Sequence, residues 1–201
     1  MNLPLDRRPV IVAVAGPNGA GKSTFFRAHL RPAGLRFLNA DDLGRELGME
    51  AYAAARLAGE LRLKLVELNE SFVFETVFSD PVGDKLAFLK MAAQRGYTVV
   101  LCFIGISSAE VCEQRVSMRV AQGGHDVPTE KLAERFPRTM ANLKSAIGEL
   151  PHVWVFDNDD LRTPFRLAAR FEGGKPLECK APIPKWLGPL LTKTQAAAQK
   201  P

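Results

Sequence analysis

The sequence predicts an α/β fold of three layers, in which a five-stranded, mainly parallel β-sheet carries helices on both faces. Short apolar runs alternate with stretches of helical periodicity along the 201 residues, a pattern typical of parallel strands joined by crossover helices. A glycine-rich segment, residues 16–24, separates the first apolar run from the first helical stretch. With 46% hydrophobic residues, the chain can form one domain with a sizeable core. We expect this domain at residues 1–180, followed by a tail rich in Pro, Lys, Ala and Gln at 181–201.

The first half of the chain contains three predicted strands, each a short run rich in β-branched, aliphatic or aromatic residues. They cover residues 10–15, 35–39 and 71–75. We expect a helix to start at the end of the glycine-rich segment and to end near Leu30. A longer helical region, about 41–70, should break near Gly48, because glycine readily ends a helix.

In the second half, capping residues indicate where the helices begin. Asp80-Pro81 predicts an N-cap followed by proline in the first turn of a helix, which ends near Gly96. The run over 97–106 is almost wholly apolar, as expected of a buried central strand. The remaining predicted elements are a helix opened by the capping sequence 107–110, a helix over 129–149, a strand over 152–156 and a hairpin over 165–177.

The charge balance and the cysteines bound the class of protein. The net charge is +5, which fits either nucleic-acid binding or a site that holds several phosphates. We favour the second, so nucleic acid is not the expected partner, because the sequence has no long Lys/Arg block and no RNA-binding aromatic motif. No run approaches the roughly 20 apolar residues of a membrane span. The three cysteines lack metal-ligand spacing, which predicts a reduced, cytoplasmic setting.

The glycine-rich segment GPNGAGKST contains the G-x-x-x-x-G-K-S spacing of a phosphate-binding loop. Its glycines allow backbone N–H groups to approach phosphates, and the following helix N-terminus adds a partial positive charge. Lys22 can reach the β- and γ-phosphates of ATP, and the Ser23 hydroxyl can bind Mg²⁺. The predicted ATP contacts are Gly16, Pro17, Asn18, Gly19, Ala20, Gly21, Lys22, Ser23 and Thr24.

Carboxylates follow the second and third predicted strands. Because ligands sit beyond the carboxyl ends of parallel strands, we expect Asp41, Asp42, Glu75 and Thr76 at the same rim as the phosphate loop. One interpretation makes Asp41 and Asp42 a helix cap and a first-turn acid. The other makes one of them the base that orients an acceptor hydroxyl beside Mg²⁺. Glu75 is either an exposed strand end or part of the site.

Arginines recur at helical spacing later in the chain. Arg115 and Arg119 lie four residues apart on one predicted helix, and Arg135 and Arg138 share a face of the next. Phosphoryl transfer needs cations around the transferred group. These arginines therefore predict a mobile lid at about 115–140, with two solvated amphipathic helices as the alternative.

Missing motifs exclude two classes of phosphate-loop protein, the ABC-transporter ATPases and the G proteins. The sequence has neither the L-S-G-G-Q signature of ABC-transporter ATPases nor the N-K-x-D motif of G proteins. The acid that ends the last apolar strand, Asp157, is followed by Asn158 rather than by glutamate.

The sequence resembles the zeta-toxin-like kinases, a branch of the phosphate-loop kinases, over roughly residues 8–175. The resemblance is carried by GPNGAGKST, LNADD, FVFET, RVAQGGHDVPTEKLAERFPRTMANL and VWVFDN. It implies a phosphate-loop NTPase fold with a kinase-type lid, and ATP and Mg²⁺ as cofactors. It also implies a cytoplasmic enzyme that phosphorylates a hydroxyl group.

The resemblance also implies roles for the charged residues. Lys22 and Ser23 would hold ATP and Mg²⁺, and Asp41 would act as the base toward the acceptor hydroxyl while also lying near the metal. Asp42, Glu75 and Thr76 would contact the acceptor or the metal.

For the lid, the resemblance implies that Arg119 and Arg135 act on the transferred phosphate, with Arg115 and Arg138 as close rivals because the loop length differs from that of longer zeta toxins.

The acceptor is the least determined part of the prediction. The best-studied zeta toxins phosphorylate a UDP-linked amino sugar, so the resemblance implies the reaction and not the substrate. Arg56, with Glu60 four residues later, either lines the acceptor pocket or forms a surface ion pair. A small-molecule kinase is the main hypothesis. A nucleic-acid end kinase and a nucleotide-binding switch without an acceptor are the alternatives, and a toxin would need an antitoxin partner.

Overall fold

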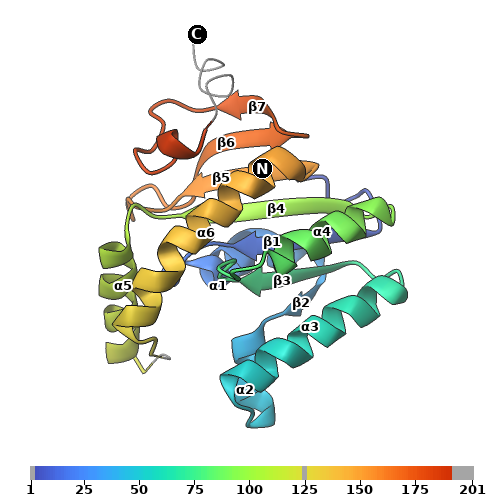
Figure 1. Ribbon diagram of the computed structural model, residues 1–201, viewed down its shortest axis with the longest axis horizontal. Coiled ribbons are helices and arrows are strands. Elements are labelled where there is room, and N and C mark those ends of the chain that lie inside the picture. The colour runs from blue at the N-terminus through green and yellow to red at the C-terminus, as the bar shows by residue number, and fades with distance from the viewer. Residues whose placement is uncertain (1–2, 124–125, 192–201) are drawn as a thin grey trace.

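A single seven-stranded β-sheet organises the protein (Figure 1). The computed structural model describes residues 3–123 and 126–191. The strand order is β2-β3-β1-β4-β5-β6-β7, with parallel pairing from β2 to β5 and antiparallel pairing beyond. The strands are β1 (Val10–Ala15), β2 (Arg36–Leu38), β3 (Phe72–Thr76), β4 (Thr98–Gly105), β5 (His152–Asp157), β6 (Arg166–Glu172) and β7 (Lys175–Cys179).

The predicted α/β class and parallel sheet are confirmed, but the sheet is wider than predicted. The five parallel strands lie within one or two residues of their predicted positions. The predicted C-terminal hairpin forms β6 and β7 and pairs with β5, because the outer edge of β5 would otherwise leave its backbone groups unpaired. The sheet therefore has seven strands instead of five.

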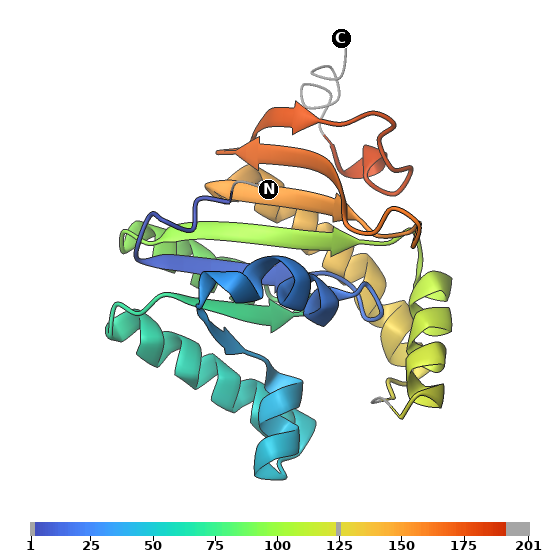
Figure 2. The same ribbon diagram turned by 180° about the vertical axis from the view of Figure 1, so that it is seen from behind.

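Helices cover both faces of the sheet. They are α1 (Lys22–Phe25), α2 (Ala40–Leu47), α3 (Ala51–Glu67), α4 (Asp84–Gln94), α5 (Ala109–Ala121) and α6 (Thr129–Glu149), with a π-helical turn η1 (Phe26–Leu30) and two 3-10 turns, η2 (Arg31–Ala33) and η3 (Gly188–Leu190). Buried side chains of α3, α4 and α6 form one core with the sheet. Those of α1, η1 and α5 form the other, and α1 and η1 cross the sheet in the rear view (Figure 2). None of the helices among the described residues is long and apolar enough to cross a bilayer.

The centre of the sheet brings three strand ends together. Strand β1 is wholly buried and pairs in parallel with both β3 and β4. In this register Ala15, the last residue of β1, lies beside Thr76 on one side and Phe103 on the other. The segments that follow these strands therefore meet at one edge of the sheet.

Two helix boundaries test the capping predictions. The break at Gly48 is confirmed, since α2 ends at Leu47 and Gly48 adopts a left-handed φ of 62°. The predicted start at Asp80-Pro81 is wrong, because α4 begins at Asp84. The side chain of Asn142 donates to the carbonyl oxygens of Phe78 and Asp80, and these bonds hold the segment outside the helix.

The segment after β7 folds back onto the sheet. The Trp186 indole donates to Asp157 Oδ1 at 3.0 Å, and its ring lies so close to Gly105 that a Cβ there would stand 2.1 Å from it. Leu187 is fully buried, so part of the predicted tail belongs to the core. The last ten residues of that tail, 192–201, lie outside the described residues.

The contact between Trp186 and Gly105 predicts the effect of Gly105→Ala. The added methyl would displace the indole ring, since the backbone of β4 cannot retreat. We expect the free energy of unfolding to fall by about 1–3 kcal/mol, measured by urea denaturation. Gly148→Ala is the matched control, because nothing lies within 4 Å of a Cβ at this position in α6, and alanine there should be neutral or stabilise by up to about 1 kcal/mol. Equal stability of the two variants would contradict the packing of Trp186 on β4.

Candidate functional site

The predicted phosphate loop connects β1 to α1 at the edge where the strand ends meet. Gly16 has a φ of 145°, and a Cβ on it would lie 2.1 Å from the carbonyl oxygen of Ile104 in β4. Gly21, directly before α1, has a φ of 91°. Both positions require glycine, so the loop conformation depends on the motif residues and on the strand beside it.

Lys22 lies inside this loop. Its side chain is only 7% exposed, and Nζ donates to the carbonyl oxygen of Pro17 at 3.0 Å. Burial lowers the pKa of Lys22, and the charge of Arg119 adds to this effect, whereas the carboxylates of Glu75 and Asp41 act in the opposite direction. Lys22, Glu75, Asp41 and Arg119, which come from four segments of the chain, therefore share one electrostatic environment.

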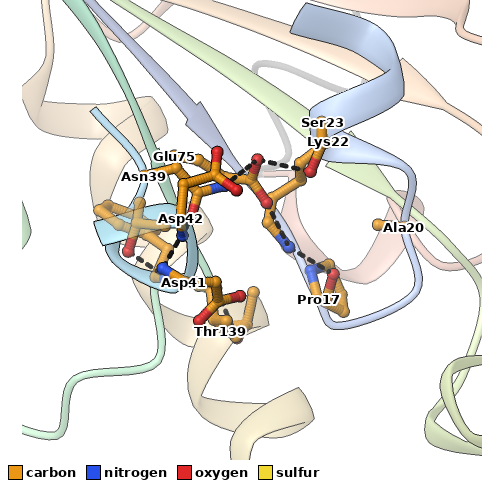
Figure 3. A network of polar contacts seen from close by, with 12 residues as sticks. Pro17, Ala20, Lys22, Ser23, Asn39, Asp41, Asp42, Glu75 and Thr139 are labelled. Atoms are coloured by element: carbon orange, nitrogen blue, oxygen red, sulfur yellow. Dashed lines mark hydrogen bonds and ion pairs between the residues drawn. The ribbon is translucent and has the colours of Figure 1, made fainter. Parts of the chain in front are cut away.

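The carboxylate of Glu75 is the centre of a polar network (Figure 3). Its Oε2 accepts hydrogen bonds from the Ser23 hydroxyl at 2.8 Å and from the Asn39 amide at 3.1 Å. Its Oε1 lies 3.9 Å from Lys22 Nζ. Glu75 thus links the phosphate-loop helix to the end of β2, and its side chain is not an exposed strand end.

Asn39 caps helix α2, a role that the sequence left open for Asp41. The Asn39 Oδ1 accepts from the backbone N–H groups of Asp41 at 2.8 Å and Asp42 at 3.4 Å. Both aspartates lie in the first helical turn. Asp42 forms an ion pair with Arg45, whereas the exposed Asp41 influences Lys22 electrostatically. Of the two aspartates, Asp41 is therefore the one whose charge acts on the buried lysine.

The residues present fit a magnesium ion bound together with a nucleotide. Mg²⁺ usually takes one or two protein oxygens and completes its shell with phosphates and water. The Ser23 hydroxyl donates its proton to Glu75, which leaves its lone pairs for a cation. Within residues 3–123 and 126–191, no group of three or more His, Cys, Asp or Glu could hold a metal.

The four predicted lid arginines lie in different surroundings. Arg119 is close enough to Lys22 to affect its pKa, and Arg135 lies beside the phosphate-loop residues Pro17 and Asn18. The Arg115 guanidinium donates to the Asp159 carbonyl oxygen at 2.9 Å. Arg138 forms an ion pair with Glu134 on its own helix, at 3.0 Å.

Two further residues predicted for the site, Thr76 and Arg56, make their polar contacts outside the network of Glu75. The Thr76 hydroxyl accepts from the backbone N–H of Phe78 at 3.0 Å and so shapes the turn after β3. Arg56 forms an exposed pair with Glu60 at 4.0 Å, the surface alternative considered from the sequence. The Gly124-His125 part of the quoted lid sequence lies outside the described residues.

A cleft of 520 Å³ opens between α5 and the loop after β5. Two apolar side chains line it although they are largely exposed, Met118 at 56% and Leu161 at 64%. Val111 is a third apolar residue of the lining, and the polar residues are Ser107, Gln114, Arg115, Asp159, Asp160 and Arg162. Apolar side chains beside hydrogen-bonding groups can hold the face and the edge of a planar nucleobase. Arg115 connects this cleft to the phosphate loop, since its Cβ would lie 3.0 Å from a Cβ on Gly19.

Asn158 is a residue of the site that sequence reasoning did not identify. It is 4% exposed, its amide donates to the Ala20 carbonyl oxygen at 2.8 Å, and its Oδ1 accepts from the Phe165 N–H at 3.1 Å. Asn158 therefore fastens the phosphate loop to the loop that borders the cleft. An uncharged polar residue after an apolar strand was the only signal available.

Comparison with known proteins supports the fold. A family model described as an AAA domain matches residues 11–140, and no curated protein matches the sequence. Similar structures include a chain of the AvrRxo1-ORF1:-ORF2 complex with ATP, with a TM-score of 0.65 and 17% identity, covering 83% of this chain and 59% of that one. The protein thus spans well under two thirds of that relative.

Two other similar structures come from named bacteria. The PezAT toxin–antitoxin system of Streptococcus pneumoniae has a TM-score of 0.57 and 15% identity, over 82% of this chain and 72% of that one. A candidate kinase from Chloroflexus aurantiacus has a TM-score of 0.55 and 19% identity, over 77% and 91%. At these identities the likeness establishes a shared fold.

The two hydrogen bonds of Asn158 predict the consequence of Asn158→Asp. The substitution would replace the donor to the Ala20 carbonyl with an oxygen and would bury a charge. We expect a loss of at least about 2 kcal/mol in the free energy of unfolding, measured by urea denaturation. Asn69→Asp, the same change at an exposed position, should cost less than about 0.5 kcal/mol. Comparable losses in the two variants would mean that Asn158 does not fasten the phosphate loop.

Proposed function

The chain belongs to the AAA domain family, and we propose that it is a kinase that transfers the γ-phosphate of ATP to a hydroxyl group of a small molecule. One observation carries this proposal. Asn39 supplies the cap of α2, so the Asp41 carboxylate is exposed while acting electrostatically on Lys22. A base and a phosphate-binding lysine on opposite sides of one site are what phosphoryl transfer to an acceptor requires.

The nucleotide is proposed to lie along the phosphate loop. The backbone N–H groups of residues 16–24 and the Lys22 ammonium would hold the phosphates. The adenine base of ATP would enter the cleft that Met118, Leu161 and Arg115 line. Mg²⁺ would bind at Ser23, with Asp41 nearby, and would supply charge neutralisation between the phosphate oxygens. Glu75 would keep the Ser23 hydroxyl turned so that its lone pairs face the metal.

The transfer itself is proposed to rely on positioning and charge. Asp41 would accept the proton of the acceptor hydroxyl as its oxygen attacks the γ-phosphorus, and ADP would leave in line. Arg119 and Arg135 would contribute positive charge near the transferred group, since one affects Lys22 and the other lies beside Pro17 and Asn18. The lid at about 115–140 is part of this proposal.

The acceptor and the partners are the finer part of the proposal. A UDP-linked amino sugar is the first acceptor to test, because of the sequence resemblance to zeta-toxin-like kinases. The half-buried Asp42 and Thr76 and the exposed Arg56 are the proposed acceptor contacts. Two of the similar structures are described as a complex with a second open reading frame and as a toxin–antitoxin system, so a covering antitoxin protein is a proposed partner. A cytoplasmic location completes the proposal.

Asp41→Asn tests the proposed base. With ATP–Mg²⁺ and a panel of UDP-sugars, nucleosides and other alcohols, the wild type should form a phosphate ester visible by ³¹P NMR. The variant should form it about 10²- to 10⁴-fold more slowly, because it cannot take up the hydroxyl proton. Asp84→Asn, which changes an exposed first-turn acid of α4, is the control and should match the wild type. If ATP is hydrolysed equally slowly by all three proteins and no ester forms, the kinase proposal is wrong.

Leu161→Asp tests where the adenine base of ATP binds. The side chain is exposed, so the variant should keep its thermal stability. It should bind ATP about tenfold more weakly by isothermal titration calorimetry, since one apolar wall of the cleft is lost. Leu177→Asp on β7, where leucine is 55% exposed, should leave ATP affinity unchanged. If Leu161→Asp binds ATP as tightly as the wild type, the adenine base does not occupy this cleft.

A further inference from the structure

Helix α2 carries the proposed base, yet the core does not fix its position. None of its residues is buried, and strand β2 before it has three residues and pairs only with β3. Its packing contacts are with α3. The position of the Asp41 carboxylate relative to the phosphate loop therefore depends on the packing of α2 against α3 and on the polar contacts at the start of α2, because a surface helix without buried residues is only weakly restrained.

The side chain of Asn39 stands at this junction, between Leu38 at the end of β2 and Ala40 at the start of α2 (Figure 3). It uses both of its polar ends. The amide Nδ2 donates to Glu75 Oε2 at 3.1 Å, and Oδ1 accepts the N–H groups of Asp41 at 2.8 Å and of Asp42 at 3.4 Å. The same Glu75 oxygen accepts from the Ser23 hydroxyl.

We infer that Asn39 is a positioning residue, which holds the first turn of α2 at a set distance from Glu75 and Ser23; this inference rests on the proposed function. The continuous path runs from Ser23 through Glu75 and Asn39 to the backbone of Asp41. It couples the segment proposed to bind the metal to the segment that carries the base. Alignment of the base with the phosphate strongly affects phosphoryl transfer, since misplacement by about 1 Å can cost about 100-fold in rate.

Only asparagine among the good N-cap residues can make both contacts. Aspartate caps a helix equally well but has no donor for Glu75 when it is ionised. Serine also caps, but its shorter side chain carries a single oxygen, which cannot stand in the positions of both Oδ1 and Nδ2 of asparagine. Substitution by either residue therefore keeps an oxygen that can cap α2 but removes the amide that donates to Glu75.

Asn39→Ser and Asn39→Asp test the inference, with phosphate release from ATP–Mg²⁺ in water as the activity readout. Because a capping oxygen remains, the melting temperature of Asn39→Ser and its increase on adding ATP–Mg²⁺ should stay close to those of the wild type. Asn39→Asp places a second carboxylate beside Glu75 and should lower the melting temperature, because like charges at this distance repel. We expect kcat to fall about 10- to 100-fold, while KM for ATP changes less than about threefold, since the phosphate loop is intact. Asn69→Asp, the same chemical change at an exposed site, should leave every readout unchanged.

A reciprocal exchange adds a readout that a cap alone would not affect. In Asn39→Asp combined with Glu75→Gln, the new amide at 75 can donate to the new carboxylate at 39, so the bond reforms with its polarity reversed. The fall in kcat of the double variant should then be smaller than the product of the two single falls. Its loss in free energy of unfolding, measured in urea, should be smaller than the sum of the two single losses.

Four results overturn the inference. Wild-type kcat in Asn39→Ser would show that the bond to Glu75 is not needed. Parallel losses in melting temperature, KM and kcat in Asn39→Ser would show that Asn39 is a helix cap alone, as would strictly additive effects in the double variant. If the wild type neither releases phosphate nor is stabilised by ATP–Mg²⁺, the proposed function fails and the inference with it, a result distinct from the other three.

Discussion

The parallel pairing of β1 with β3 and β4 is the constraint on which the site depends. Because β1 is buried on both faces and flanked on both edges, its end cannot shift without breaking two ladders of hydrogen bonds. The phosphate loop leaves β1 between these neighbours, and Gly16 passes against the Ile104 carbonyl with no room for a side chain. Glu75 comes from β3 on the other side, one residue before the strand ends. The distance between the loop and this carboxylate is therefore a property of the sheet.

The charges of the site are arranged around one buried lysine. Burial disfavours the charged form of Lys22 and lowers its pKa, while Glu75 and Asp41 favour that form. The two acids thus help to keep an ammonium group in a place where water does not reach it. In the proposed reaction the same acids flank the phosphates, and the repulsion between them and the nucleotide is what a magnesium ion at Ser23 would relieve.

The two sides of the site differ in how firmly they are held. The nucleotide side rests on the sheet, on buried side chains of α1 and on Asn158, which joins the phosphate loop to the loop after β5. The side proposed to bind the acceptor rests on α2, which has no buried residue and packs against α3, and on the polar contacts of Asn39. Substitutions on the side proposed to bind the acceptor can therefore alter its contacts without disturbing the phosphate loop, since one fold can carry different sites.

The sequence by itself determined the fold class, the strand positions within one or two residues and the phosphate loop, because these depend on local signals: apolar runs, capping residues and the spacing of glycines. It also predicted Asp41 and Glu75 at one rim of the sheet, since the carboxyl ends of parallel strands meet there. Only the tertiary structure decided that Asn39 is the cap, that Glu75 binds Ser23, that Asn158 fastens the loop and that the hairpin widens the sheet to seven strands. These contacts join residues 36 to 138 positions apart or depend on which of several polar side chains wins a shared partner. Spacing along the chain carries no information about either, because the distances are set by how the strands pair and how the helices pack on them.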